Sequence, residues 1–424
     1  MTDIVKWTVG VDWSKSTHQV CVEDTVGLIL GERGFAHGGA GLAALCDWLV
    51  ETTAGRPEEI AVAIEVPHGP IVETLLERGF AVYAINPKQV DRFRDRFSMA
   101  GAKDDRLDAH VMSDALRTDR HRLRRLQPTE PMVIELREWS RMGEELQEEQ
   151  TRLANRIREQ LWRYYPEVLE LGDDVTAGWF LEIWALAPTP AEAARISKEA
   201  VAGVLKAHRV RRIDATEALR ILRKKPISVA AGTTEAATAH IRALMARLKL
   251  VNQQIREVAR ELDVRCKQLG DEGDGEPGQP IEQRDATILQ SLPGIGRINL
   301  ATLLSEGYEP LQRRDYHALR PLCGVAPVTR RSGKSKIVIM RYACHNRLRN
   351  AVYHWARVAI QHDEASRERY AALRKRGKSH GRAIRTVADR LLAIACAMLK
   401  TRTLFDPNRH AVRPKDNAAL PLTT

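Results

Sequence analysis

Residues 7–24 read WTVGVDWSKSTHQVCVED, two runs rich in β-branched and aromatic residues on either side of a polar Ser-Lys-Ser turn. Short runs of this composition predict β-strands. Two similar runs follow, EIAVAIEV (59–66) and FAVYAINP (80–87), and stretches with helical spacing lie between the runs, at residues 38–53 and 69–79. Strands that alternate with helices predict a mixed or parallel sheet covered by helices over residues 7–125.

Two long segments further along, residues 130–165 and 240–269, are rich in Glu, Arg and Leu, with apolar residues at three- and four-residue steps. This spacing predicts two long helices, which could form an antiparallel coiled coil, a dimer seam or an ordinary bundle. GDEGDGEPGQP (270–280) has the composition of a flexible linker. The predicted organisation is α/β plus α: an α/β domain, a helical region, a linker, a basic and mainly helical domain, and a tail (1–128, 129–269, 270–282, 283–405 and 406–424).

The charge of the chain is concentrated in one region. The net charge is +11, and residues 311–400 contain 21 Lys and Arg against 5 Asp and Glu, so the rest is slightly acidic. A local positive surplus of this size favours a nucleic-acid phosphate backbone as partner over a merely solvated face. The six cysteines form no CxxC pair, and no apolar run is long enough for a membrane span. We expect a soluble, intracellular protein without membrane contact.

Acidic residues gather at points where the predicted strands end. Residues 103–109 read KDDRLDA, Asp12 lies in the first strand-like run, and Glu65 closes an apolar run. Strand ends in an open α/β sheet converge on one crevice. Carboxylates brought there are suitable ligands for one or two Mg²⁺ ions, or Mn²⁺. Taken alone, Asp12 could equally be a capping residue, and Glu73 is an alternative to Glu65 as a metal ligand.

A second motif lies in the basic region. ILQSLPGIGRINLATLLSE (288–306) has an apolar-Pro-Gly-apolar-Gly turn between two helical patterns, which is typical of a helix-hairpin-helix. Gly294 and Gly296 would let backbone N–H groups approach a phosphate at a helix N-terminus. The alternative is a plain glycine-containing connection between two helices.

The order of Asp12, Glu65 and KDDRLDA after INPKQV (85–90) resembles the RuvC-like, RNase H-fold N-terminal domain of the insertion-sequence "one-ten" family of DEDD transposases. That family has a small polar residue where this chain has Asp104, and Asp105 and Asp108 keep the family's spacing. The resemblance therefore implies a metal site made by Asp12, Glu65, Asp105 and Asp108.

Residues 319–356 resemble the second domain of the same family. They contain an apolar-Gly-apolar-x-Pro turn, a Ser-Gly pair, a basic stretch and a helix with Asn346 and Arg349. The resemblance implies that Ser332 is a nucleophile. The nucleic-acid-binding residues expected around it are Arg330, Arg331, Lys334, Lys336, Asn346 and Arg349.

A lone serine hydroxyl is a weak nucleophile and needs a base, a metal or a strong field to activate it. The expected activator is Mg²⁺ from the acidic domain, so neither domain would be sufficient. The resemblance implies a prokaryotic, nucleoid-associated recombinase that cleaves and rejoins DNA through a phosphoserine intermediate. Its expected partners are element ends, target DNA, a structured noncoding guide RNA and further copies of the chain, in a dimer or tetramer.

Two alternatives remain open. In the first, the chain is a metal-dependent, structure-selective nuclease of the Holliday-junction type that uses water, and Ser332 is only architectural. In the second, it binds nucleic acid without catalysis, and its acids pair with Lys103 and Arg106. Site-specific DNA invertases are close relatives of the same family.

Overall fold

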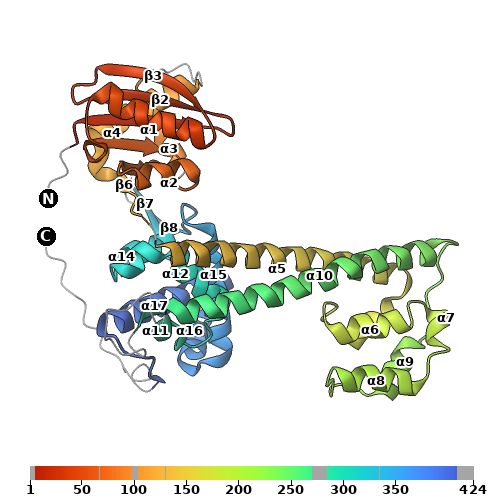
Figure 1. Cartoon of the computed structure of the whole chain (residues 1–424). Helices are drawn as coiled ribbons and strands as arrows, with labels where there is room; N and C mark the ends of the chain where they lie inside the picture. The colour runs from red at the N-terminus through yellow and green to blue at the C-terminus, as the bar shows by residue number, and fades with distance from the viewer. Residues whose placement is uncertain are drawn as a thin grey trace. The chain divides into compact units, whose positions relative to one another are not determined.

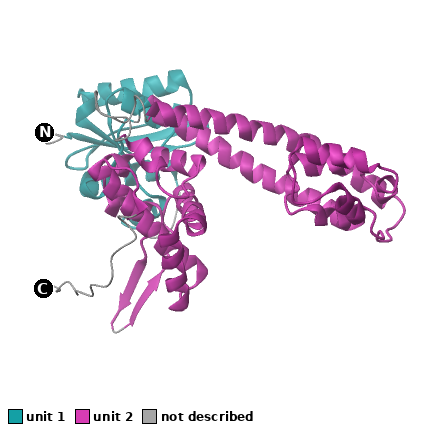
Figure 2. Cartoon of the chain, turned by 90° about the horizontal axis from the view of Figure 1, so that it is seen from below, with its two compact units in different colours: residues 1–130 teal, residues 131–424 magenta. Residues whose placement is uncertain are grey.

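The structure is a computed structural model, and it describes residues 5–65, 67–97, 104–128, 130–269, 284–333 and 335–407. The chain divides into two units, residues 1–130 and 131–424 (Figure 2). The first unit is mixed α/β and the second is mostly helical (Figure 1), which confirms the predicted fold class at that level. The predicted linker, Lys103, Lys334 and most of the predicted tail lie outside the described residues.

Unit 1 is built on a six-stranded sheet with the order β3-β2-β1-β4-β5-β6. Its central strands β1, β4 and β5 are parallel, and β2, β3 and β6 are antiparallel to their neighbours. The strands are β1 (Trp7–Trp13), β2 (Thr17–Asp24), β3 (Ile29–Ala36), β4 (Ile60–Ile64), β5 (Ala81–Ala84) and β6 (Arg124–Arg125). The helices are α1 (Gly39–Thr53), α2 (Pro70–Glu77), α3 (Pro87–Arg94) and α4 (Asp105–Asp119), with short 3-10 turns η1 (Pro57–Glu59) and η2 (Arg120–Arg122).

The two faces of this sheet are covered by different helices. Val9, Val11, Val62 and Ile64 share one apolar cluster with residues of α1 and α2. The alternate residues Ala61 and Ala63 belong to a second cluster with residues of α4. Successive side chains on a strand point to opposite faces, so the central strands are covered on both sides and read as continuous apolar runs.

Strand β3 was not predicted from the sequence. Most of its residues are exposed, and it lies at the edge of the sheet, where it pairs only with β2. An edge strand with solvent around it needs no apolar alternation, so its sequence ILGERGFA carries little strand signal.

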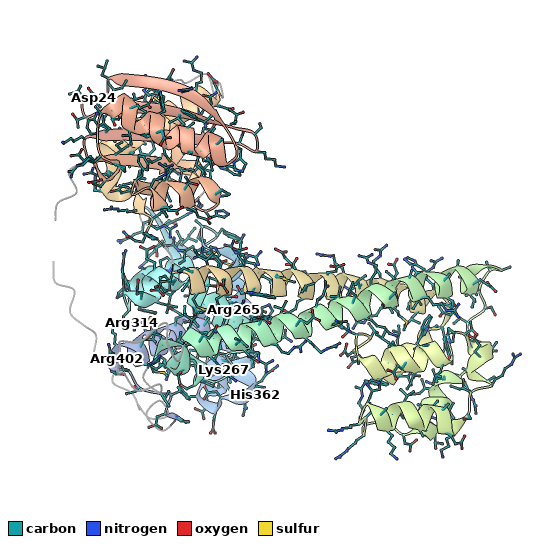
Figure 3. All side chains as sticks on the ribbon, viewed as in Figure 1. Asp24, Arg265, Lys267, Arg314, His362 and Arg402 are labelled. Atoms are coloured by element: carbon teal, nitrogen blue, oxygen red, sulfur yellow. The ribbon has the colours of Figure 1, made fainter. Side chains whose placement is uncertain are left out.

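Unit 2 is organised around two long helices, α5 (Pro131–Tyr164) and α10 (Thr233–Gln268). They run antiparallel: Arg265, labelled in Figure 3, lies 3.1 Å from Glu135 near the start of α5, and Arg247 lies 3.1 Å from Glu149 further along. The two predicted long helices therefore pair within one chain. The predicted homo-oligomer stays a prediction.

Short helices occupy the two ends of this helical pair (Figure 1). One end holds η3 (Pro166–Leu171), α6 (Gly178–Leu186), α7 (Pro190–Ala193), α8 (Lys198–Ala207) and α9 (Ala215–Leu222). The other end holds α11 (Asp285–Gln290), α12 (Arg297–Glu306), α13 (Tyr308–Gln312), α14 (Tyr316–Leu322), α15 (Asn346–His362), α16 (Glu364–Lys375), α17 (His380–Thr401) and the ribbon of β7 (Val328–Ser332) and β8 (Ser335–Ile339). One continuous apolar core runs through all of these helical parts. Among the described residues, no helix has the length and apolar character needed to cross a membrane.

Candidate active site

Asp12 and Glu65 lie at the same end of the unit 1 sheet. The parallel strands β1 and β4 pair Val11 with Ile64, so Asp12 is the next residue of β1 and Glu65 directly follows the last residue of β4. Asp12 alternates with Gly10 on the face that α4 covers. Both acids are half-buried.

Helix α4 crosses β1 at very close range because β1 has a glycine there. A Cβ on Gly10 would lie 1.8 Å from the carbonyl oxygen of Ala109, so any side chain would push the helix away. Further along, the Ser113 hydroxyl donates to the Thr8 carbonyl oxygen at 3.0 Å. The helix and the strand therefore run in opposite directions at this contact.

This contact sets the level of the remaining acids. A helix rises about 1.5 Å per residue and a strand about 3.3 Å, so four helical residues match two strand residues. Ser113 lies at Thr8 and Ala109 at Gly10, which brings the first turn of α4, with Asp105 and Asp108, level with Asp12. The four predicted ligands thus lie at the same end of the sheet.

The three acids of KDDRLDA have different surroundings. Asp104 is the N-cap of α4, and its carboxylate accepts from the Arg106 N–H at 3.3 Å. Asp105 is exposed at the first position of the helix. Asp108 is buried, and its Oδ1 accepts from Arg94 Nε at 2.6 Å. The positive end of a helix favours carboxylates, so this position stabilises all three.

The donor chemistry at this end of the sheet fits a divalent cation, since carboxylate oxygens are the ligands that Mg²⁺ prefers. Even so, no three His, Cys, Asp or Glu side chains in the described part of the chain lie close enough together to hold a metal ion. Arg94 occupies Asp108 instead, and the hydrogen bond from Arg94 to Asp108 raises the pKa of the guanidinium. The acids converge without forming a closed ligand set.

A second buried acid on the same face was missed by sequence reasoning. Glu23 of β2 is 1% exposed, with His110 Nε2 3.1 Å and Arg117 Nε 3.6 Å from its carboxylate. Neither carboxylate oxygen has a hydrogen bond of good geometry from the described residues. Burial raises the pKa of Glu23 to about 7; Asp114 adds to this shift and Arg117 opposes it. The alternation of HQVCVED places Glu23 on a covered face, and this was the available signal.

The neighbouring acid has a plain structural role. Asp24, labelled in Figure 3, accepts from the N–H groups of Val26 and Leu28, both at 2.9 Å, and so closes the turn between β2 and β3. The two adjacent acids therefore differ because one faces α4 and the other faces the turn.

Ser332 is the last residue of β7, at the tip of the two-stranded ribbon that extends from the helices of unit 2 (Figure 2). It pairs with Ser335 across a two-residue loop, and Gly333 has a φ of 54°, a conformation that glycine adopts without strain. All described residues from Thr329 to Val338 are exposed. A hydroxyl at this tip is open to a large substrate.

The cations of the ribbon divide between its two faces. Arg330 shares a face with Ser332, whereas Arg331 pairs with Lys336 on the other face. Beyond the ribbon, Asn346 is exposed at the first position of α15, and Arg349 one turn later is half-buried with Nη1 3.8 Å from the Cys344 sulfur. The ribbon can therefore present cations to a phosphate backbone on both sides.

The predicted helix-hairpin-helix lies between α11 and α12. Gly294 has a φ of 75°, and a Cβ there would lie 2.5 Å from the Ala359 nitrogen of α15. Trp355 of α15 also donates from Nε1 to the Pro293 carbonyl oxygen at 2.9 Å. Gly294 is thus required by packing against α15. Gly296, the N-cap of α12, has open space around it.

Comparisons with known proteins show the family of this chain. Residues 9–166 match a family model described as "Transposase", and residues 286–371 match one described as "Transposase IS116/IS110/IS902 family". The protein called "Mini-circle putative transposase for IS117" of Streptomyces coelicolor is 31% identical over 407 residues, which cover 94% of this chain and 95% of that protein. "Putative transposase y4uE" of Sinorhizobium fredii is 56% identical over 223 residues, 52% of this chain and 62% of that relative.

These matches place the chain among the transposases, the class of enzyme that moves DNA segments. The match to the IS117 protein extends over nearly all of both chains. The chain belongs to the IS110 family of transposases.

Proposed function

We propose that this chain cuts and rejoins DNA at the ends of its insertion sequence and at the target, with Ser332 as the nucleophile. The observation that supports this most is the position of Ser332 at the exposed tip of the β7–β8 ribbon, beside Arg330. An accessible hydroxyl next to a guanidinium suits attack on a phosphodiester, because the cation holds the phosphate and offsets its charge.

In the proposed step, a bond forms between Ser332 Oγ and phosphorus while the bond from phosphorus to one deoxyribose oxygen breaks. The proton of the serine hydroxyl ends on the leaving oxygen, so atoms and charge balance and a free deoxyribose hydroxyl remains. Attack of another strand's hydroxyl on the phosphoserine restores the serine and rejoins the DNA. The phosphodiester energy is kept in the covalent intermediate.

We assign Asp12, Glu65, Asp105 and Asp108 to the binding of Mg²⁺ or Mn²⁺. Such an ion, when bound, supplies positive charge that stabilises the charge developing on the phosphate. Asp108 has to leave Arg94 to take part, and Asp91 offers the arginine a second partner, at 2.9 Å from Arg94 Nη1. The proposal requires the carboxylates and Ser332 to act on the same phosphodiester.

We assign sequence recognition to base pairing with a structured noncoding RNA from the element. The cations of the ribbon suit phosphates, which fix position and carry no sequence information. Base pairing would then supply specificity that backbone contacts lack. Assembly as a dimer or tetramer in the prokaryotic cytoplasm belongs to the same proposal.

The second candidate function is nucleic-acid binding without catalysis, which the ion pair between Asp108 and Arg94 favours. In that case the acids serve only structure. This function predicts that the acids of KDDRLDA pair with Arg106, but Arg106 pairs with Glu32 of β3.

The experiment uses the full chain with Mg²⁺, labelled element-end and target DNA, and RNA transcribed from the flank of the element. Denaturing electrophoresis then shows whether label stays with the protein. We expect a shifted band that disappears with Ser332→Ala and with Asp12→Asn but persists with the matched control Ser335→Ala. Cleaved DNA without a shifted band, still formed by Ser332→Ala, would identify a nuclease that uses water.

A further inference from the structure

A group of short helices, residues 166–232, lies at the end of the α5–α10 pair opposite to α12 and α15 (Figure 1). We call it the distal knob. Within it, residues 195–225 contain 10 Lys and Arg against 3 Asp and Glu. Residues 166–194 contain six Asp and Glu and no Lys or Arg, so the positive surplus belongs to residues 195–225 and is separate from that of residues 311–400.

Most of this positive charge is not neutralised by the protein. The knob is fully described, and eight of its exposed cations have no carboxylate within ion-pair distance: Arg195, Lys198, Lys206, Arg209, Arg211, Arg212, Arg223 and Lys225. Arg212 and Arg223 donate instead to backbone carbonyl oxygens. Two of the three acids are already engaged, since Asp214 caps α9 and Glu217 pairs with Arg220 at 2.6 Å. The free cations are thus available to an anionic partner.

The cations at the end of α8 are held in place by the backbone. Arg209 has a φ of 54°, and the hydrogen bonds Val210 N–H to Leu205 and Arg209 N–H to Lys206 form the turn that usually ends a helix with glycine. A non-glycine residue is strained in this conformation, and such strain points to a function for the side chain.

Arg212, three residues on, is fixed by packing. Its guanidinium lies over the Trp179 ring, 5.0 Å from the centroid, and a Cβ on Gly172 would lie 1.9 Å from its Nη2. A preorganised guanidinium loses little rotamer freedom when it binds an anion. A favourable interaction with the α8 helix end accounts for Lys206 but not for Arg211 and Arg212, which lie beyond it.

The surface of the knob fits a duplex better than a single strand. Its largest aromatic residues, Trp179, Phe180 and Trp184, are buried, so none is available to stack on unpaired bases. Cations without stacking groups suit the phosphates of a double helix.

The knob and the C-terminal helices attach to α5 at points that are about one turn of DNA apart. The C-terminal helices attach to α5 at Arg141, 2.8 Å from Glu306, and at Glu144, 2.5 Å from Arg347, whereas the knob begins after Tyr164. About twenty helical residues separate these points, which is ~30 Å and close to one turn of B-DNA.

We propose that Lys206, Arg209, Arg211 and Arg212 form a phosphate-binding site for double-stranded DNA, about one turn along the duplex held by the C-terminal helices. The spacing rests on the proposed function, which assigns DNA to the β7–β8 ribbon. The knob then acts as a second, sequence-independent grip that fixes the direction of the duplex along α5.

The test compares binding of the full chain to duplexes of about 12 and about 30 base pairs, the longer of which spans both contacts. The knob variant is Lys206→Gln, Arg209→Gly and Arg211→Gln; glycine at 209 suits the backbone, so the variant should fold, as circular dichroism would verify. The matched control removes three cations that already have acidic partners: Arg152→Gln, Arg220→Gln and Lys224→Gln.

We expect wild type and control to bind the long duplex more tightly than the short one, and the knob variant to bind both equally. The salt slope for the long duplex should fall by about 1 per lost contact, roughly 3 in all, in the knob variant alone. The proposal would be overturned if the knob variant kept the wild-type salt slope and still bound the long duplex more tightly than the short one. It would also be overturned if the knob variant lost affinity only for duplex RNA, or if wild type bound both DNA lengths equally.

These results are separable from the proposed function. A length gain that the knob variant loses, together with the absence of any DNA–protein adduct, would leave the knob site standing and remove the serine mechanism. An adduct with an unaffected knob variant would give the reverse conclusion.

Discussion

Asp108 and Arg94 form a buried ion pair at the end of the sheet where the acids that we propose as metal ligands lie. Their side chains are 6% and 16% exposed, and the bond between them is short and charge-assisted. A metal ion and Arg94 would compete for the same carboxylate. The guanidinium therefore neutralises Asp108 in the protein without metal.

Arg94→Ala should destabilise unit 1 by about 3 kcal/mol in the absence of divalent cations, because it leaves a buried carboxylate unpaired. Mn²⁺ should restore more stability to this variant than it adds to wild type, since the ion no longer displaces an arginine. Thermal unfolding with and without Mn²⁺ measures both effects. Arg92→Ala, on the exposed side of the same helix, is the control. A smaller Mn²⁺ effect in Arg94→Ala than in wild type would contradict the competition.

Glu23 predicts a pH dependence of stability. Its pKa is about 7 in the folded chain against the usual 4.5, so the folded state holds the proton more tightly than the unfolded chain. This contribution is fully present below pH 4.5 and is lost as the pH rises to about 7. A glutamine at this position does not titrate, so Glu23→Gln does not lose stability as the pH rises. The stability of Glu23→Gln relative to wild type should therefore rise by roughly 1–3 kcal/mol between pH 4.5 and about 7.

Urea unfolding of wild type and Glu23→Gln at several pH values provides the measurement. Glu51→Gln, an exposed change on α1, is the control. A difference between Glu23→Gln and wild type that stays constant with pH would mean that Glu23 does not titrate in this window.

At this scale the sequence predicts the identities of the converging acids through their order along the chain and their family resemblance. It could not predict the pairing of Asp108 with Arg94, because that pair joins two helices whose approach depends on tertiary packing. Glu23 was missed for a related reason: a glutamate in a strand is buried or exposed according to which face a helix covers.

The contact between α4 and β1 is the element-scale feature that brings the acids together. It depends on Gly10, where the helix backbone reaches the strand, and no periodicity in WTVGVDW reveals this. The structure similarly assigns Gly294 to the packing of α15, where the sequence suggested a phosphate contact. In both cases the sequence shows the glycine but does not show which helix packs against it.

Gly10→Ala should destabilise unit 1 by about 3 kcal/mol or more, because the new Cβ meets backbone atoms that no side-chain rotation can move. Binding of Mn²⁺ should weaken as well, since α4 positions Asp105 and Asp108. Gly39→Ala, at the start of α1 with open space around it, is the control and should be neutral or slightly stabilising. Thermal unfolding and Mn²⁺ titration test this, and equal behaviour of the two variants would refute the close contact.

Across the whole molecule, positive charge is distributed over two regions of unit 2. The surplus of residues 311–400 was evident from the sequence, whereas that of residues 195–225 was hidden because the neighbouring residues 166–194 contain six Asp and Glu and no Lys or Arg. The two long helices follow directly from the spacing of apolar residues, which left open whether they pair within one chain or between chains. The edge strand β3 and the helices of the knob have weaker patterns, because partial burial at the edge of a core tolerates many sequences.

The central claim is that Ser332 becomes covalently joined to DNA. The most direct measurement is peptide mapping of the DNA–protein adduct after nuclease trimming and digestion at arginine, which releases residues 332–341, SGKSKIVIMR, as one peptide. The account predicts a nucleotide phosphate on Ser332 and an unmodified Ser335 in the fragment spectrum. A phosphate on Ser335, on a residue outside this peptide, or on no residue while the DNA is still cut, would contradict it.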